Sequence, residues 1–217
     1  LDAVVREGLW EKFETMFRNF GWDVVVLRHG ALQEAAFKEP GGAKLRDWIE
    51  ACPNQLYSAL TFQGGAAWRK RLMDEIGDQG DVSALIARRS DAELAALMGN
   101  LGGHDLPMLL DAFEAARKHD RPVCFIAYTI KGHGLPLAGH KDNHAGLMTK
   151  SQMQEYRARA GINQGAEWDP YAGLSLPPAE IAAFLKQVPF NAKGRRRLVA
   201  ERIPVCPLYP SPSPRDS

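Results

Sequence analysis

The sequence lacks long apolar runs and contains few cysteines. None of its apolar stretches approaches the roughly 18 residues of a membrane-spanning helix, and its N-terminal residues show no signal-peptide pattern. The three cysteines (Cys52, Cys124 and Cys206) form no CxxC pair and would leave one thiol unpaired, so we expect reduced thiols and no disulfide framework. These absences favour a cytoplasmic protein without a membrane partner.

A large excess of one charge is also absent. The 217 residues carry 27 basic and 26 acidic side chains, for a net charge of +1, and this balance creates no global field that would attract nucleic acid. Hydrophobic residues make up 45% of the chain and charged residues 24%, a composition that excludes disorder and predicts a globular domain. Residues 190–217 are basic and rich in Pro and Ser, which predicts a linker toward a second domain.

The apolar pattern predicts an α/β fold with a parallel sheet. β-rich runs at 22–27 and 123–130 predict two strands, the first buried on both faces. Helical signals at 4–20 and 106–118 precede them. Strand, helix and strand form a right-handed βαβ unit, and residues 31–100 form a helical insertion in its crossover. Two further helices are expected, one capped by Thr149 and one at 178–188.

Residues 131–146 follow the second strand, at the sheet edge where open α/β proteins bind ligands. Lys131 enters this glycine-containing loop, where an ammonium and backbone N–H groups can hold a phosphate; an exposed lysine at a strand end is the alternative. Four of the six histidines (His104, His133, His140 and His144) lie in loops beside the βαβ unit. Proton transfer, helix capping and simple solvent exposure are all compatible with their positions. No further ligands with metal spacing accompany them, so we expect no metal site here.

Several segments resemble, in order, the cofactor domain of the transketolase-like thiamine diphosphate enzymes. They are NFGWDV at 19–24, GHD at 103–105 and TIKGHG at 129–134, followed by His140 and His144. The insertion, with GAAWR at 65–69, resembles instead the homodimeric-type pyruvate dehydrogenase, the decarboxylating component of 2-oxo acid dehydrogenase complexes. The resemblance covers residues 1 to about 165. It implies that residues 1–189 are an incomplete thiamine diphosphate-binding domain with a helical insertion at about 31–100.

The resemblance also implies an activity and site residues. The enzyme would be an oxidoreductase that acts on pyruvate, the product of glycolysis. It would use thiamine diphosphate and magnesium to decarboxylate this 2-oxo acid. It would pass the acetyl group to a lipoyl-bearing acyltransferase and act as a homodimer. Matching motifs assign Lys131 and Leu1 to cofactor binding, and His144 and, by a poorer match, His140 to catalysis. The GDG…N metal motif and the activating glutamate of the family are absent from the sequence. We therefore expect the magnesium ligands upstream of Leu1 and the 217 residues alone to be inactive.

Two other functions stay open. A transketolase would move two-carbon units between sugar phosphates with the same cofactor, but the long insertion and the lack of an assignable sugar-phosphate-binding arginine argue against it. A non-catalytic α/β module would bind an acidic partner or RNA through Arg195–Arg197. A steep salt dependence of nucleic-acid binding would favour the module, whereas oxidative decarboxylation would favour the enzyme.

Overall fold

The computed structural model describes residues 9–188. Leu1, Cys206 and residues 190–217, with the basic Arg195–Arg197 segment, lie outside the described residues, so the predictions placed on them stay predictions. The chain divides into two compact units, Leu1–Tyr156 and Arg157–Ser217. In the part that the structure describes, no helix combines the length and the apolar character that crossing a bilayer requires.

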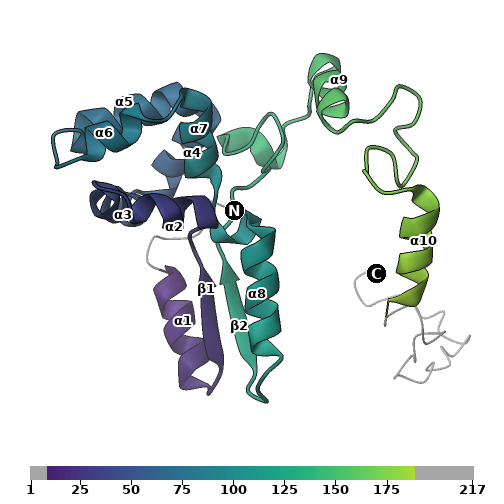
Figure 1. Ribbon diagram of the computed structural model, residues 1–217, viewed down its shortest axis with the longest axis horizontal. Helices are drawn as coiled ribbons and strands as arrows, with labels where there is room; N and C mark the ends of the chain where they lie inside the picture. The colour runs from purple at the N-terminus through teal and green to yellow at the C-terminus, as the bar shows by residue number, and fades with distance from the viewer. Residues whose placement is uncertain (1–8, 189–217) are drawn as a thin grey trace, which may run out of the picture. The chain divides into compact units, whose positions relative to one another are not determined.

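The first unit contains two parallel strands, β1 (Asp23–Leu27) and β2 (Val123–Ala127), which pair along their whole length. Helix α1 (Leu9–Asn19) precedes β1, and helix α8 (Leu106–Ala116) precedes β2. In Figure 1 these two helices flank the strands from opposite sides. The predicted α/β class and the parallel pairing across a helical crossover are thus confirmed.

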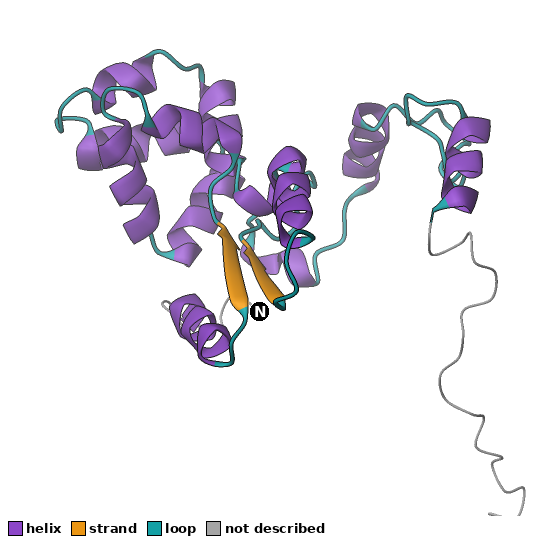
Figure 2. Cartoon of the chain, turned by 60° about the horizontal axis from the view of Figure 1, so that its bottom comes forward, coloured by secondary structure: helices purple, strands orange, loops and turns teal. Residues whose placement is uncertain are grey.

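The strands are more open than the sequence predicts. Burial of β1 on both faces is wrong, because Val26 is 39% exposed and Leu27, at 7%, is the one buried residue of the strand. β1 and β2 are each other's only neighbours among the described strands (Figure 2), and the helices cover so narrow a sheet incompletely. β2 also ends earlier than expected, since the carbonyl of Tyr128 accepts a hydrogen bond from the Gly103 N–H (2.9 Å) rather than from a strand.

The hydrophobic core lies in the helical segment between the strands. This segment contains six helices, α2 (Ala31–Phe37), α3 (Gly42–Ala51), α4 (Asn54–Gln63), α5 (Gly65–Ile76), α6 (Val82–Ala87) and α7 (Asp91–Gly99). The predicted helical insertion is therefore confirmed. It buries one contiguous cluster of side chains, the largest being Trp68, Leu45, Leu72, Leu85, Ile86, Leu94 and Met98. The insertion thus supplies most of the buried apolar surface that stabilises the unit.

Close packing of α5 on α7 explains the sequence GAAWR in physical terms. A Cβ atom on Gly65 would lie 1.7 Å from the backbone oxygen of Asp91, so the two helices can approach only over a glycine. Trp68 fills the core at 1% exposure. Arg69 donates to the Ile86 carbonyl (3.0 Å) and to the Asp91 carboxylate (2.6 Å). The motif therefore joins α5 to both following helices.

Asp105 connects the starts of two helices. It caps α8, where its carboxylate accepts from the Met108 N–H (3.3 Å). The same carboxylate accepts from the Ala31 N–H at the start of α2 (2.8 Å), and these backbone donors, with the Ala31 bond the strongest, hold its pKa below the usual value. Asp105 thereby ties the segment that follows β1 to the helix that leads into β2.

The two last helices follow their predicted starts. Helix α9 (Lys150–Arg159) begins after Thr149, whose hydroxyl oxygen accepts from the Gln152 N–H (3.3 Å). Helix α10 (Pro178–Gln187) begins at its proline. Residues 157–188 contain no buried side chain, so the described part of the second unit has no core of its own.

Candidate functional site

A cavity of about 600 Å³ lies at the carboxyl ends of β1 and β2. Arg28 and His29 line it directly after β1, and residues 126–131 line it at the end of β2. Helix α4 contributes a further wall through Asn54, Tyr57 and Ser58. The cavity therefore occupies the sheet edge where the sequence predicts a ligand crevice.

The lining of this cavity combines positive charge with aromatic rings. Three lining side chains are basic, those of Arg28, His29 and Lys131, and no lining residue is Asp or Glu. The rings of Trp10 and Tyr128 lie 6.5 Å apart on its wall. A cavity with cations, no carboxylates and aromatic walls suits an anionic ligand that carries a flat ring.

His29 belongs to a buried hydrogen-bond network. Its side chain is 5% exposed, with Nδ1 2.9 Å from Gln33 Oε1 and Nε2 3.3 Å from Glu50 Oε1. The Gln33 amide nitrogen faces the Met98 carbonyl (3.4 Å), which orients its oxygen toward the histidine. Both nitrogens of His29 are thus occupied, and the ring offers no free donor to a ligand.

The hydroxyl of Tyr57 is likewise occupied by hydrogen bonds within the protein. Its hydroxyl donates to the Met98 carbonyl (2.5 Å) and accepts from Gln33 Nε2 (3.1 Å). Burial raises the pKa of this phenol well above its usual value. We therefore assign Tyr57 to the wall of the cavity and not to proton transfer.

Lys131 lines the cavity at the start of a compact loop. Its carbonyl accepts from the Asn143 side-chain amide (2.7 Å) and from the Gly139 N–H (3.2 Å). Gly132 has a φ of 73°, and a Cβ atom there would lie 2.2 Å from Asn143 Nδ2. The glycine therefore allows Asn143 to close the loop behind Lys131. No partner contacts the Lys131 ammonium among residues 9–188, so it is available to a ligand.

The loop is fastened to α4 by two contacts. Gly139 lies against the helix backbone, where a Cβ atom would be 2.4 Å from the Ser58 oxygen. One residue further, the ring of His140 packs on Phe62 with centroids 4.5 Å apart, and its Nδ1 accepts from the Asp142 N–H (3.1 Å). His140 therefore anchors and caps the loop in this structure.

His144 lies at the end of a short 3₁₀ helix, Lys141–His144, and is exposed. Neither His144 nor His140 lines the cavity that contains Lys131. The structure thus places the predicted phosphate-binding lysine at the crevice and both predicted catalytic histidines in the adjoining loop. Their catalytic roles stay predictions.

His104 and His133 form a stacked pair beside this loop. Their ring centroids are 3.7 Å apart, with planes inclined by 15°. His104 Nε2 accepts from the Ile130 N–H (2.7 Å), so this histidine holds the backbone one residue before Lys131. Burial, and secondly the charge of His133, lower the pKa of His104 below its usual value.

This lowered pKa predicts an acid-sensitive contribution to stability. Because the unfolded chain binds the proton more tightly, with a pKa of about 6.5, the contribution is complete above that pH. It is lost as the pH falls toward the folded-state pKa. We expect urea unfolding between about pH 5 and 8 to show that the free energy of unfolding decreases toward low pH. In His104→Gln this decrease should be smaller, because glutamine keeps a hydrogen-bond acceptor but does not titrate. Equal pH dependence in both proteins would contradict this role of His104.

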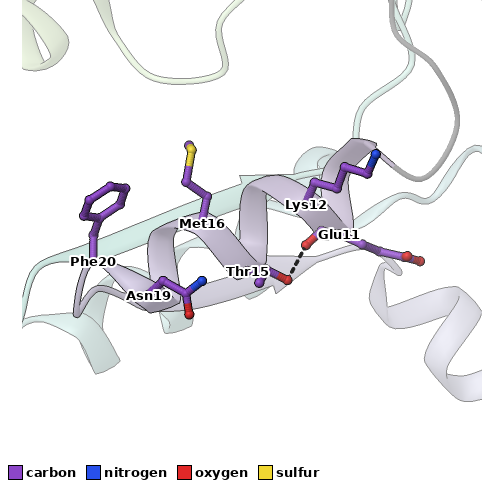
Figure 3. A pocket seen from close by; sticks show the side chains of 6 residues that line it. All are labelled: Glu11, Lys12, Thr15, Met16, Asn19 and Phe20. Atoms are coloured by element: carbon purple, nitrogen blue, oxygen red, sulfur yellow. Dashed lines mark hydrogen bonds between the residues drawn. The ribbon is translucent and has the colours of Figure 1, made fainter.

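A second hollow lies along α1 and the turn that follows it. It measures about 560 Å³ and is lined by Glu11, Lys12, Thr15, Met16, Asn19 and Phe20. Figure 3 shows Met16 and Phe20 projecting from the same side of the helix, while the Thr15 hydroxyl donates to the Glu11 carbonyl (2.8 Å). None of the site residues predicted from sequence lines this hollow, and its carboxylate opposes the binding of an anion.

No metal-binding cluster is found in the described part of the chain, where three or more His, Cys, Asp or Glu side chains nowhere converge. Leu1, the other residue that the sequence assigns to cofactor binding, lies outside the described residues, so its role stays a prediction.

Sequence reasoning missed several side chains that line the cavity together with Lys131. Arg28 directly follows the first strand, just as Lys131 directly follows the second strand as the sequence predicts it, at 123–130. The rule that singled out Lys131, a cation at the carboxyl end of a parallel strand, would therefore have found Arg28 too. Trp10 carried no such signal, because its place in the wall depends on how α1 packs.

Comparison with known proteins gives one consistent result. No protein-family model matches the chain. The chain is 26% identical to the pyruvate dehydrogenase E1 component of Cupriavidus necator, an alignment that covers 94% of this chain and 24% of that protein. It is 27% identical to the pyruvate dehydrogenase E1 component of Corynebacterium glutamicum (94% and 22% covered) and 26% identical to that of Haemophilus influenzae (82% and 19%). The resemblance to pyruvate dehydrogenase is therefore confirmed, and the chain spans about a quarter of the length of the first two relatives.

Proposed function

We propose that this chain forms part of the cofactor domain of a thiamine diphosphate-dependent 2-oxo acid dehydrogenase of the pyruvate dehydrogenase E1 type. The observation that carries the proposal is the cavity with Lys131 at the carboxyl ends of two parallel strands. The similarity to E1 components along 94% of the chain supports it.

The described residues fit one part of this cofactor. A diphosphate needs cations and N–H donors, and the cavity offers the Lys131 ammonium and an acid-free lining. The cofactor's flat rings fit the aromatic wall of Trp10 and Tyr128. Magnesium is different, because residues 9–188 contain no suitable ligand cluster. In this proposal the magnesium ligands lie outside residues 9–188.

The bound cofactor would supply the electron sink for decarboxylation, while the protein positions groups and moves protons. Lys131 holds the anionic end. His144 lies in the loop that Asn143 closes and α4 supports, and it takes up or releases a proton. The loop excludes water when it covers the crevice. His140 contributes through its contact with Phe62, which holds that loop in place. Leu1, outside the described residues, is kept in this proposal as a cofactor-binding residue. In this proposal pyruvate is the substrate, a lipoyl-bearing acyltransferase accepts the acetyl group, and a second subunit completes the site.

A substrate assay tests the proposal. The natural polypeptide that carries this sequence, supplied with thiamine diphosphate, magnesium and an artificial electron acceptor, should decarboxylate pyruvate. It should not transfer two-carbon units between sugar phosphates. Sugar-phosphate transfer without pyruvate turnover would favour a transketolase and overturn the proposal.

Replacing Lys131 with alanine should weaken cofactor binding about tenfold or more, because a charge-assisted contact to phosphate is lost. Turnover at saturating cofactor should change little. Fluorescence titration with thiamine diphosphate and magnesium measures the affinity, and Lys118→Ala, an exposed lysine of the same unit, is the control. Unchanged affinity in Lys131→Ala would remove this residue from the binding site.

A further inference from the structure

Arg28 differs from most other described arginines in its electrostatic surroundings. Nine other described arginines lie within 4.0 Å of a carboxylate oxygen; these are Arg18, Arg46, Arg69, Arg71, Arg88, Arg89, Arg117, Arg121 and Arg157. Arg28 forms no such ion pair within residues 9–188 and lines the acid-free cavity. The hydrogen bond from Arg46 is the main cause that lowers the pKa of Glu50, and the charge of Arg28 adds to it, so Arg28 acts on this nearby carboxylate without contacting it.

Two contacts fix the position of the Arg28 guanidinium. Its Nη2 donates to the backbone carbonyl of Glu50 (2.9 Å), and its Cζ lies 5.4 Å from the centre of the Tyr128 ring. A guanidinium has five N–H donors, and this carbonyl occupies one side of the fork. The remaining donors belong to a group that is already oriented, so binding an anion costs little side-chain entropy.

The other basic side chains of the cavity cannot replace Arg28. Both ring nitrogens of His29 face Gln33 and Glu50, so His29 has no donor to give. Lys131 enters from the end of β2, whereas Arg28 follows β1. The cavity thus presents two available cations from two adjacent strands.

From these contacts we propose that Arg28 binds an oxyanion of the ligand that occupies the cavity, in addition to the anionic group held by Lys131. The shared chemistry is a planar fork of N–H donors facing carboxylate or phosphate oxygens. Under the proposed function the anion is either the carboxylate of the 2-oxo acid or a phosphate of the cofactor. The choice between these two anions rests on the proposed function, whereas the binding of an oxyanion by Arg28 does not.

The test titrates the natural polypeptide that carries this sequence, without cofactor, with sodium pyruvate and, separately, with sodium pyrophosphate at constant ionic strength, followed by isothermal titration calorimetry. The variants are Arg28→Gln, Arg28→Lys and Lys131→Gln, with Arg117→Gln, an exposed arginine of the same unit, as the matched control. Circular dichroism spectra of the free proteins verify that each variant is folded.

Arg28→Gln should weaken binding of at least one anion about tenfold, and Arg28→Lys should restore only part of it, because it keeps the charge but loses the fork. A loss confined to pyruvate identifies a carboxylate site, and a loss for pyrophosphate shared with Lys131→Gln identifies a phosphate site. If Lys131→Gln weakens binding while Arg28→Gln matches the control, the inference about Arg28 falls and the proposed cofactor site stands. If the unaltered chain binds neither anion, the inference falls, whereas the substrate assay decides the proposed function independently.

Discussion

Replacing His144 with alanine is expected to slow turnover of pyruvate about 10²–10⁴-fold, the usual effect of removing one general acid or base. The His144 side chain is exposed, so its imidazole is accessible to a reacting group, and imidazole is the side chain that most often serves as general acid or base. The loop that carries it is held by Asn143 and rests on α4 through Gly139. Losing the ring should therefore remove a reacting group without disturbing the fold.

The measurement compares turnover and cofactor affinity of the natural polypeptide with and without this substitution. Affinity for thiamine diphosphate should stay within a factor of about two to three, since Lys131 and not His144 lines the cavity. His119→Ala replaces another exposed histidine of the same unit and controls for general effects. Near-normal turnover of His144→Ala at saturating cofactor would leave His144 as an ordinary loop histidine.

The second large effect is expected from Gly65→Ala, which should destabilise the first unit by about 1–3 kcal/mol or more. The new Cβ atom would meet the Asp91 oxygen at 1.7 Å and its carbonyl carbon at 2.4 Å. Both are backbone atoms that no side-chain rotation can move. The helices α5 and α7 must therefore separate, and the core around Trp68 would lose contacts.

Urea unfolding of Gly65→Ala and of the unaltered chain measures this difference in the free energy of unfolding. Gly99→Ala is the matched control, because Gly99 ends α7 with open space around it, and alanine there should leave the stability unchanged or slightly raised. Equal stability of Gly65→Ala and the unaltered chain would show that the α5–α7 contact is looser than the structure has it.

Local signals predicted much of the fold. The hydroxyl cap at Thr149 and the proline at the start of α10 are local features, and they can be recognised from residue types near a helix start. The parallel pairing of β1 and β2 followed from two apolar runs joined by a helical crossover. The burial of β1 was wrong, because it depends on how many strands and helices surround it and not on its own residues.

The candidate site was predicted only where chain order fixes position. Lys131 lies at the cavity because a residue that follows a parallel strand lies at one edge of the sheet. The contact between His140 and Phe62 joins residues 78 positions apart, and no periodicity in either segment indicates it. The contacts of His29 with Gln33 and Glu50 likewise form only when α2 and α3 pack together, so the sequence alone does not predict them.

The central claim is that the cavity at the carboxyl ends of β1 and β2 holds the anionic end of thiamine diphosphate. The most direct measurement is an experimental structure of the natural polypeptide that carries this sequence, determined with thiamine diphosphate and magnesium. The account predicts diphosphate density within hydrogen-bonding distance of the Lys131 ammonium, in the cavity that Arg28 and Tyr128 also line. Cofactor density elsewhere, with this cavity empty or filled by protein side chains, would contradict it.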